Sequence, residues 1–105
     1  YILKDRFHHQ FAPDVAPAEA RLMAATQRPI AEAALGEPAS AAAWKSVPSW
    51  FVYGDADKNI PPAVQAFMAQ RAKAVKTVVV KGGSHVVMTS RPDVVARLIV
   101  EAARH

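Results

Sequence analysis

The chain has 105 residues, of which 51% are hydrophobic and 21% are charged. This composition is typical of one globular domain and unlike that of a disordered segment. Cysteine is absent, which excludes disulfides and thiolate metal sites. The formal net charge is +4, but Lys and Arg are spread along the chain among acidic residues, so we expect no nucleic-acid partner.

Residues 1–47 are rich in alanine and proline and carry no strand signal. A helix is predicted over Pro17–Gln27, with Asp14 as the side chain that caps it and proline in the tolerated first turn. A second short helix is predicted over Pro29–Leu35, ending at Gly36 in the left-handed conformation. Short helices separated by prolines are typical of a cap packed over another body. We therefore expect this segment to be a helical cap or lid.

Residues 48–105 alternate strand and helix signals. The run Pro48–Gly54 is apolar, aromatic and β-branched without interruption, which predicts a strand buried on both faces of a parallel sheet. A helix begins at Pro61–Pro62 and carries Phe67 and Met68 on its apolar stripe. The spacing predicts that both side chains pack against the sheet.

A second strand is predicted over Thr77–Val80, and a last helix begins with the capping-box pattern Ser90–Asp93. The apolar face of this helix recurs at helical spacing, in Val95, Leu98, Ile99 and Ala102. Strand, helix, strand and helix in this order leave the two strands parallel, with their carboxyl ends at one edge. The predicted fold class is therefore α/β. Two strands leave open edges, so we expect further strands from a missing segment, a partner chain or a second copy.

Polar residues with catalytic potential follow both predicted strands. Asp57 ends a Gly-x-x-Asp turn, and His85 ends a Gly-Gly-Ser-His loop. Ligands of open α/β sheets bind outside the carboxyl ends of the strands, so we expect these two side chains to lie together. A carboxylate can orient an imidazole that takes a proton from a hydroxyl nucleophile. Asp55 follows the same strand and is the reserve acid, although an Asp in a turn also commonly bonds its own backbone.

No nucleophile for this pair is visible. None of the five serines lies in a Gly-x-Ser-x-Gly elbow. Ser84 comes nearest, but Val86 stands where the second glycine is needed, and the adjacent His85 is poorly placed to activate the hydroxyl. The sequence thus holds an acid and a base, and the identity of the nucleophile is unknown.

Other candidate sites are weaker. Asp5 and His9 offer two ligands at helical spacing, fewer than a metal site requires, so no metal is expected. Phe7, Phe11 and Met23 would line a substrate cleft if the cap covers one, and plain core packing is an equally good interpretation.

No apolar run approaches the about 20 residues that a transmembrane helix needs, and the N-terminus lacks the ordered blocks of a signal peptide. We therefore expect no membrane partner and a cytoplasmic location. The chain opens at Tyr1 and not at a methionine, from which we expect a portion of a longer protein.

The motifs around the acid and the base resemble those of the α/β-hydrolase family: Gly-x-x-Asp-x-x-Ile-Pro in residues 54–61 and Gly-x-Ser-His in residues 82–85. The family's order of nucleophile, acid and histidine agrees with Asp57 before His85. The resemblance implies that the two predicted strands are the seventh and eighth of the family's sheet, and that residues 7–43 are its cap. The first six strands, the nucleophile elbow and the oxyanion-hole loop have no counterpart here.

By that resemblance, the chain comprises the cap, residues 1–47, and the C-terminal βαβα part, residues 48–105, of a serine hydrolase. It would supply Asp57 and His85 to a triad whose serine lies outside the chain. The implied substrate is a small ester, with no metal or organic cofactor, and the partner is the missing N-terminal segment or a second copy. Two alternatives stay open: a non-catalytic remnant that folds by self-association or with another chain, and haloperoxidase-like or dehalogenase-like activity.

Overall fold

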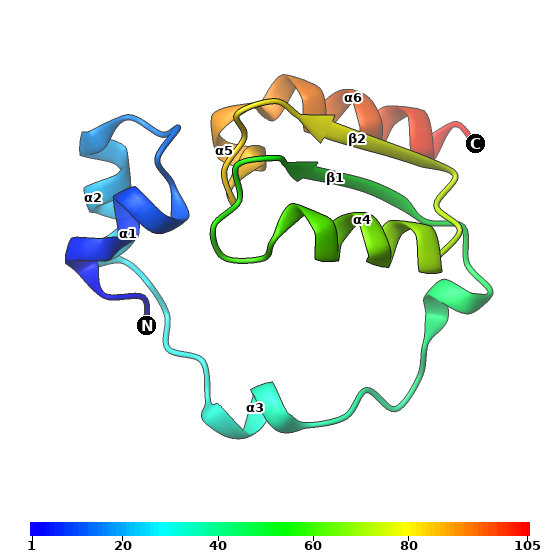
Figure 1. The fold of residues 1–105 in the computed structure, drawn as a ribbon, viewed down its shortest axis with the longest axis horizontal. Helices are drawn as coiled ribbons and strands as arrows, with labels where there is room; N and C mark the ends of the chain where they lie inside the picture. Colours follow the sequence, from blue (N-terminus) through cyan, green and yellow to red (C-terminus); the bar gives the residue numbers. More distant parts are fainter.

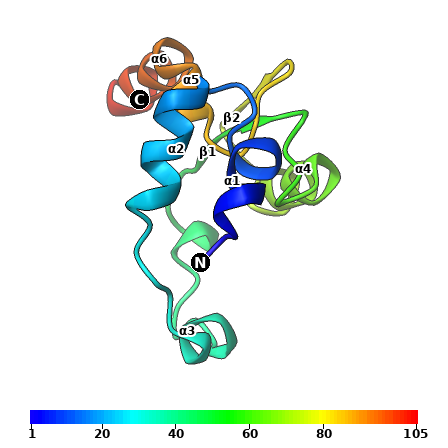
Figure 2. The same ribbon diagram turned by 90° about the vertical axis from the view of Figure 1, so that its left-hand side faces the viewer.

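The computed structural model describes residues 1–105 and consists of a small parallel sheet with helices on both sides (Figure 1). Strand β1 spans Trp50–Gly54 and strand β2 spans Lys76–Val80, and the two pair in parallel along their whole length. Helix α4, Pro62–Arg71, lies on one side of the strands and helix α6, Pro92–Ala103, lies on the other (Figures 1 and 2). Both predicted strands and the α/β fold class are confirmed.

Strand β1 is less buried than its apolar sequence predicts. Tyr53 and Gly54 are buried, but Trp50, Phe51 and Val52 are only half-buried. The sheet has two strands, so neither a third strand nor the helices that would accompany it cover the outer part of β1. The expectation of burial on both faces is therefore wrong for the first three residues.

Helix α4 has proline in its first turn, as predicted, but it packs with a different face. Phe67 and Met68 are 59% and 37% exposed, whereas Ala69 is buried. The prediction that Phe67 and Met68 pack against the sheet is wrong. The inner stripe consists of Pro62, Gln65, Ala69 and Ala72. A small side chain at the contact lets the helix approach the strands closely. Compared with the prediction, the helix is rotated about its axis, and Gln65 therefore faces inward.

Helix α6 lies where the sequence predicts a last helix, but its start differs in detail. Its N-cap position is Arg91, and no side chain caps it. Ser90 ends a separate short helix, α5, Val87–Ser90, and its hydroxyl donates to the Asp14 carboxylate. The capping-box prediction is wrong because this tertiary hydrogen bond takes the serine away from the helix end.

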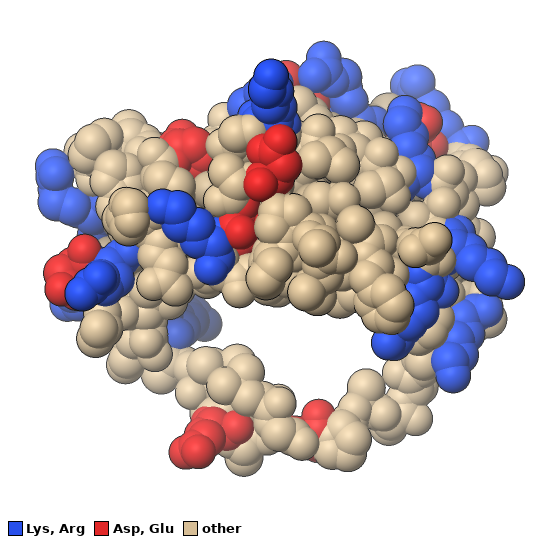
Figure 3. All heavy atoms as spheres, in the orientation of Figure 1, with Lys and Arg blue, Asp and Glu red and all other residues tan.

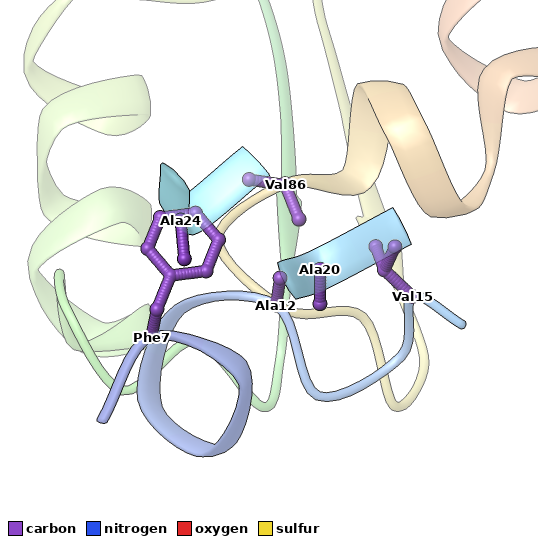
Figure 4. Packing of buried hydrophobic residues seen from close by; sticks show 6 residues of the cluster. All are labelled: Phe7, Ala12, Val15, Ala20, Ala24 and Val86. Atoms are coloured by element: carbon purple, nitrogen blue, oxygen red, sulfur yellow. The ribbon is translucent and has the colours of Figure 1, made fainter. Parts of the chain in front are cut away.

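Two helices near the N-terminus form a hairpin in front of the carboxyl ends of the strands (Figures 1 and 2). Helix α1 spans Lys4–Phe11 and was not predicted, whereas helix α2 spans Pro17–Ala25 and starts as predicted. Asp14 does not cap α2, whose N-cap position is Ala16. We call residues 4–25 the cap hairpin, although their assignment as a cap stays a prediction. Its core consists of Phe7, Ala12, Val15, Ala20 and Ala24, joined by Val86 from the second half of the chain (Figure 4).

A long connector, residues 26–49, joins the cap hairpin to β1 and arches away from the rest of the molecule (Figures 1 and 3). It contains the short helix α3, Glu32–Gly36, and a 3-10 turn, η1, Ala43–Lys45. Every residue from 28 to 41 is exposed. Helix α3 ends without the predicted left-handed glycine, since Gly36 is its last helical residue and Glu37 continues in an extended conformation.

The proposed division at residue 47 stays a prediction, since Val86 completes a core that otherwise belongs to the first segment. None of the helices combines the length and the apolar composition that crossing a bilayer requires.

Candidate active site

Two loops follow the strands, and we call them the acid loop, residues 55–61 after β1, and the base loop, residues 81–86 after β2. They run side by side at the carboxyl edge of the sheet. The backbone N–H of Asp55 donates to the Val80 carbonyl at 3.1 Å, and that of Ala56 donates to the Gly83 carbonyl at 3.0 Å. The Asp55 carboxylate accepts from the backbone N–H of Gly82 at 2.6 Å. Parallel pairing of the strands thus joins the acid loop to the base loop through the backbone.

Gly54 is required where the two loops pass each other. A Cβ atom at this position would lie 2.0 Å from the carbonyl oxygen of Gly83 and 2.7 Å from that of Ser84. Any other residue would push the acid loop and the base loop apart. The glycine of the Gly-x-x-Asp motif therefore has a steric role in bringing the loops together.

Asp57 lies at the centre of this edge, with its side chain 2% exposed. Its Oδ1 atom accepts from the backbone N–H of Asn59 at 2.8 Å and of Ile60 at 3.0 Å. Its Oδ2 atom lies 2.8 Å from Nδ1 of His85 and accepts from Nε2 of Gln65, also at 2.8 Å. Both oxygens are thus held in place, which fixes the plane of the carboxylate.

The hydrogen bonds around Asp57 decide which imidazole nitrogen carries a proton. Burial disfavours the charged carboxylate, but the hydrogen bonds from His85 and from the backbone of Ile60 and Asn59 lower the pKa of Asp57 below its ordinary value of 3.8. An ionised carboxylate only accepts hydrogen bonds, so the shared proton belongs to Nδ1 of His85. Nε2 of the neutral imidazole is then a free proton acceptor.

The imidazole of His85 lies at a partly open surface. Its side chain is 29% exposed, and no hydrogen bond from within the chain reaches Nε2. The ring of Phe11 packs on the imidazole, with centroids 4.8 Å apart and planes tilted by 43°. An oriented imidazole with a free nitrogen is the arrangement that a general base needs.

A cavity of about 240 Å³ opens beside the pair. Its polar lining consists of Asp57, Gln65, Ser84 and His85, and the apolar lining includes Val52, Tyr53, Val87, Met88 and Val95. Pockets for drug-sized ligands usually span about 300–1,000 Å³. The cavity by itself is therefore smaller than a pocket for a drug-sized ligand.

The remaining predicted site residues are placed differently. Asp55 is bound to the backbone of Gly82 and makes no hydrogen bond to His85. Phe7 is buried inside the cap hairpin, Met23 packs against the same core, and Phe11 touches the imidazole. Of the three suggested lining residues, Phe11 alone lies directly beside the acid–base pair. Their contact with a substrate, and the catalytic roles of Asp57 and His85, stay predictions.

Ser84 is not arranged as a nucleophile. It is 1% exposed, and its hydroxyl oxygen accepts from the backbone N–H of Val86 at 3.1 Å. No three His, Cys, Asp or Glu side chains lie close enough together to hold a metal ion. Of the two residues considered for a metal, His9 has its Nε2 atom 3.3 Å from Nζ of Lys58.

Residues 1–98 match the sequence profile of the alpha/beta hydrolase family. The chain belongs to this family. It is 29% identical over 101 residues to Alpha/beta hydrolase nvfD of Aspergillus novofumigatus (strain IBT 16806). The aligned part covers 96% of this chain and 39% of the relative, so the chain spans well under half the length of that protein. The resemblance noted for the acid and base loops is thus confirmed at the level of the family.

Two residues that shape the site are not found by the sequence analysis. Gln65 donates to Asp57, and its only sequence signal is a polar position within an otherwise small-residue stripe of α4. Asp14 binds Ser84 and Ser90, 70 and 76 residues further along the chain. No local pattern connects residues so far apart, so only the tertiary structure reveals this contact.

Proposed function

We propose that this chain supplies the acid and the histidine of a Ser-His-Asp triad in a serine hydrolase that acts on small esters. The single observation that carries the proposal is the 2.8 Å contact between Asp57 Oδ2 and His85 Nδ1, with Nε2 unengaged. Family membership supports the same reading. The nucleophilic serine is proposed to come from outside these 105 residues.

The proposed reaction is acyl transfer to water. His85 Nε2 takes the hydroxyl proton of the serine as the serine oxygen bonds to the ester carbonyl carbon, and Asp57 stabilises the imidazolium that forms. The imidazolium then protonates the departing alcohol as the ester C–O bond breaks. A water molecule, deprotonated by the same nitrogen, attacks the acyl-enzyme and releases the acid and the serine.

Substitution of the histidine tests the proposal. In the protein that carries this chain with its nucleophile, His85→Ala should lower kcat for p-nitrophenyl acetate by about 10,000-fold. His105→Ala is the matched control, because His105 is exposed and packs on Trp50 at the opposite end of the sheet (Figure 1). Turnover by His85→Ala within tenfold of the unaltered protein would overturn the assigned role.

The identity of the nucleophile, together with the pocket, separates ester hydrolysis from haloperoxidase-like or dehalogenase-like chemistry on the same fold. A fluorophosphonate probe labels an activated serine. Labelling that depends on His85 supports the esterase proposal, and active protein that stays unlabelled supports the other chemistries.

A second candidate function is a non-catalytic chain that folds by self-association or with a partner chain. It is favoured by the two-stranded sheet, in which both strands are edge strands with unpaired backbone groups. The test is sedimentation velocity of the 105-residue chain together with fluorophosphonate labelling. An unlabelled oligomer supports this candidate, whereas a labelled monomer contradicts it.

A further inference from the structure

The cap hairpin contacts His85 and both of its neighbours in the chain. Val86 is 5% exposed and belongs to the core of the hairpin (Figure 4). Ser84 is 1% exposed, and its backbone N–H donates to the Asp14 carboxylate. The Phe11 ring packs on the imidazole itself. The position of the base therefore depends on the hairpin as well as on strand β2.

Asp14 is the polar link between the cap hairpin and the base loop. Its Oδ2 atom accepts from the backbone N–H of Ser84 at 2.9 Å and from the hydroxyl of Ser90 at 2.7 Å. One bond holds the residue before His85, and the other holds the end of α5. A single oxygen atom thus restrains both ends of the segment 84–90.

Capping of helix α2, the local role expected for Asp14, does not account for the position of its carboxylate. Asp at the start of a helix commonly caps the first turn, but the N-cap position of α2 is Ala16, and no side chain caps this helix. The carboxylate is directed to the second half of the chain instead. Hydrogen bonds from Ser84 and Ser90 outweigh burial and lower the pKa of Asp14 below 3.8, so it is an ionised acceptor at neutral pH.

We infer that Asp14 is a positioning residue for His85: by holding Ser84 and Ser90, it keeps the imidazole on Asp57 and Nε2 directed toward the nucleophile. The inference rests on the proposed function. One acceptor oxygen at this point is sufficient for the role, because both donors use the same atom. The negative charge itself is not required.

The experiment compares Asp14→Ala with Asp14→Asn in the protein that carries this chain with its nucleophile. Asparagine keeps an acceptor oxygen and alanine does not. Asp14→Ala should lower kcat for p-nitrophenyl acetate by about 10- to 100-fold with KM unchanged, because a misaligned base slows the chemical step. Asp14→Asn should stay within about threefold of the unaltered protein. Asp5→Ala is the matched control, since Asp5 is an exposed acid of the same hairpin.

Proton NMR provides a readout that does not depend on turnover. The Nδ1 proton that His85 shares with Asp57 should give a downfield signal in the unaltered protein, in Asp14→Asn and in Asp5→Ala. In Asp14→Ala that signal should broaden or disappear as solvent exchange increases. If the protein hydrolyses no ester, the proposed function fails, and this signal alone then decides the role of Asp14.

Two results would overturn the inference. The first is an Asp14→Ala variant with unaltered kcat and an unaltered Nδ1 signal. The second is an equal loss in Asp14→Ala and Asp14→Asn, which would exclude the acceptor oxygen as the cause. Should Asp14→Ala fail to fold, Ser90→Ala removes one donor and should lower kcat by about tenfold at constant KM, and a kcat within about threefold of the unaltered protein in that variant would likewise overturn the role.

Discussion

At Asp57, four donors converge on one carboxylate, two on each oxygen. Two of these donors are backbone N–H groups of Asn59 and Ile60, so the turn itself orients the acid. The other two are the side chains of His85 and Gln65. Because each oxygen is engaged, the carboxylate has no free rotation, and the imidazole that binds it has one tautomer and one direction.

The lowered pKa of Asp57 predicts how stability depends on pH. In the unfolded chain this carboxyl takes up a proton near pH 3.8, whereas in the folded chain it does so at lower pH. The resulting stabilisation is fully present above pH 3.8 and is lost as the pH falls through the folded-state value. The free energy of unfolding, measured with urea between pH 2 and about 6, should therefore decrease below pH 3.8.

The variant Asp57→Asn should show a smaller decrease over the same pH range, because the group that titrates is gone. Asp14 has a lowered pKa as well, so part of the decrease should remain. Identical pH curves for Asp57→Asn and the unaltered chain would contradict this account.

Gln65 is predicted to stabilise the ionised acid. Gln65→Leu removes one donor from a nearly inaccessible carboxylate and should lower the free energy of unfolding by about 2 kcal/mol, the usual worth of a hydrogen bond to a charged group. Gln70→Leu is the matched control, because Gln70 is exposed on the same helix. Equal changes in the two variants, measured by urea unfolding, would show that the Asp57 contact contributes nothing.

At the scale of elements, hydrophobic spacing predicts where helices occur better than which way they face. In α6 the predicted apolar face contains both Leu98, which is 6% exposed, and Ile99, which is 62% exposed. In α4 the inner face contains Gln65 and Ala69, whereas the predicted face contained Phe67 and Met68. A two-stranded sheet covers only a narrow part of a helix surface. Several apolar faces of the helix could therefore fit it, and the tertiary packing decides which one is buried.

The acid loop and the base loop can pass each other because Gly54 has no side chain. Gly54→Ala would place Cβ against the backbone of Gly83 at 2.0 Å, and backbone atoms cannot move aside as a flexible side chain can. The substitution should lower the free energy of unfolding by about 3 kcal/mol, the upper end of overpacking effects. Chemical denaturation followed by tryptophan fluorescence measures the change.

The matched control is Gly36→Ala, since a Cβ atom there meets nothing within 4 Å and the residue ends a helix. This substitution should leave stability within about 0.5 kcal/mol of the unaltered chain. A loss of equal size at both glycines would remove the steric argument for Gly54.

At the scale of the whole molecule, two bodies are joined by an exposed connector. The cap hairpin and the βαβα part meet at the base loop, through Asp14, Phe11 and Val86. They also meet at the acid loop, where Nζ of Lys58 donates to the carbonyl of His9 at 3.2 Å. The connector arches around an opening and adds little to that contact (Figure 3). The association of the two bodies therefore depends on side-chain contacts and not on the covalent link.

This arrangement predicts the outcome of limited proteolysis. An endoproteinase that cleaves after glutamate should cut first at Glu32, which lies in the exposed connector, and later at Glu19 and Glu101, which lie in packed helices. The two fragments should then elute together in size-exclusion chromatography. Separate elution after a single cut would mean that the contacts at the base loop do not hold the bodies together.

The sequence alone determined the order of strands and helices in the second half and the loops that carry Asp57 and His85. It also indicated the family, because the Gly-x-x-Asp and Gly-x-Ser-His motifs are short and can be recognised without the tertiary structure. Parallel pairing follows from that order of elements, so the sequence already indicated that the acid and the histidine share one edge of the sheet.

Only the tertiary structure decided which faces of α4 and α6 are buried, that Gln65 supports Asp57, and that Asp14 binds Ser84 and Ser90 instead of capping a helix. These features arise from contacts between residues far apart in the chain. Local sequence patterns indicate the hydrogen bonds and the apolar spacing within one or two helical turns. They cannot show which distant donor competes for the same side chain, and that competition is decided when the chain packs.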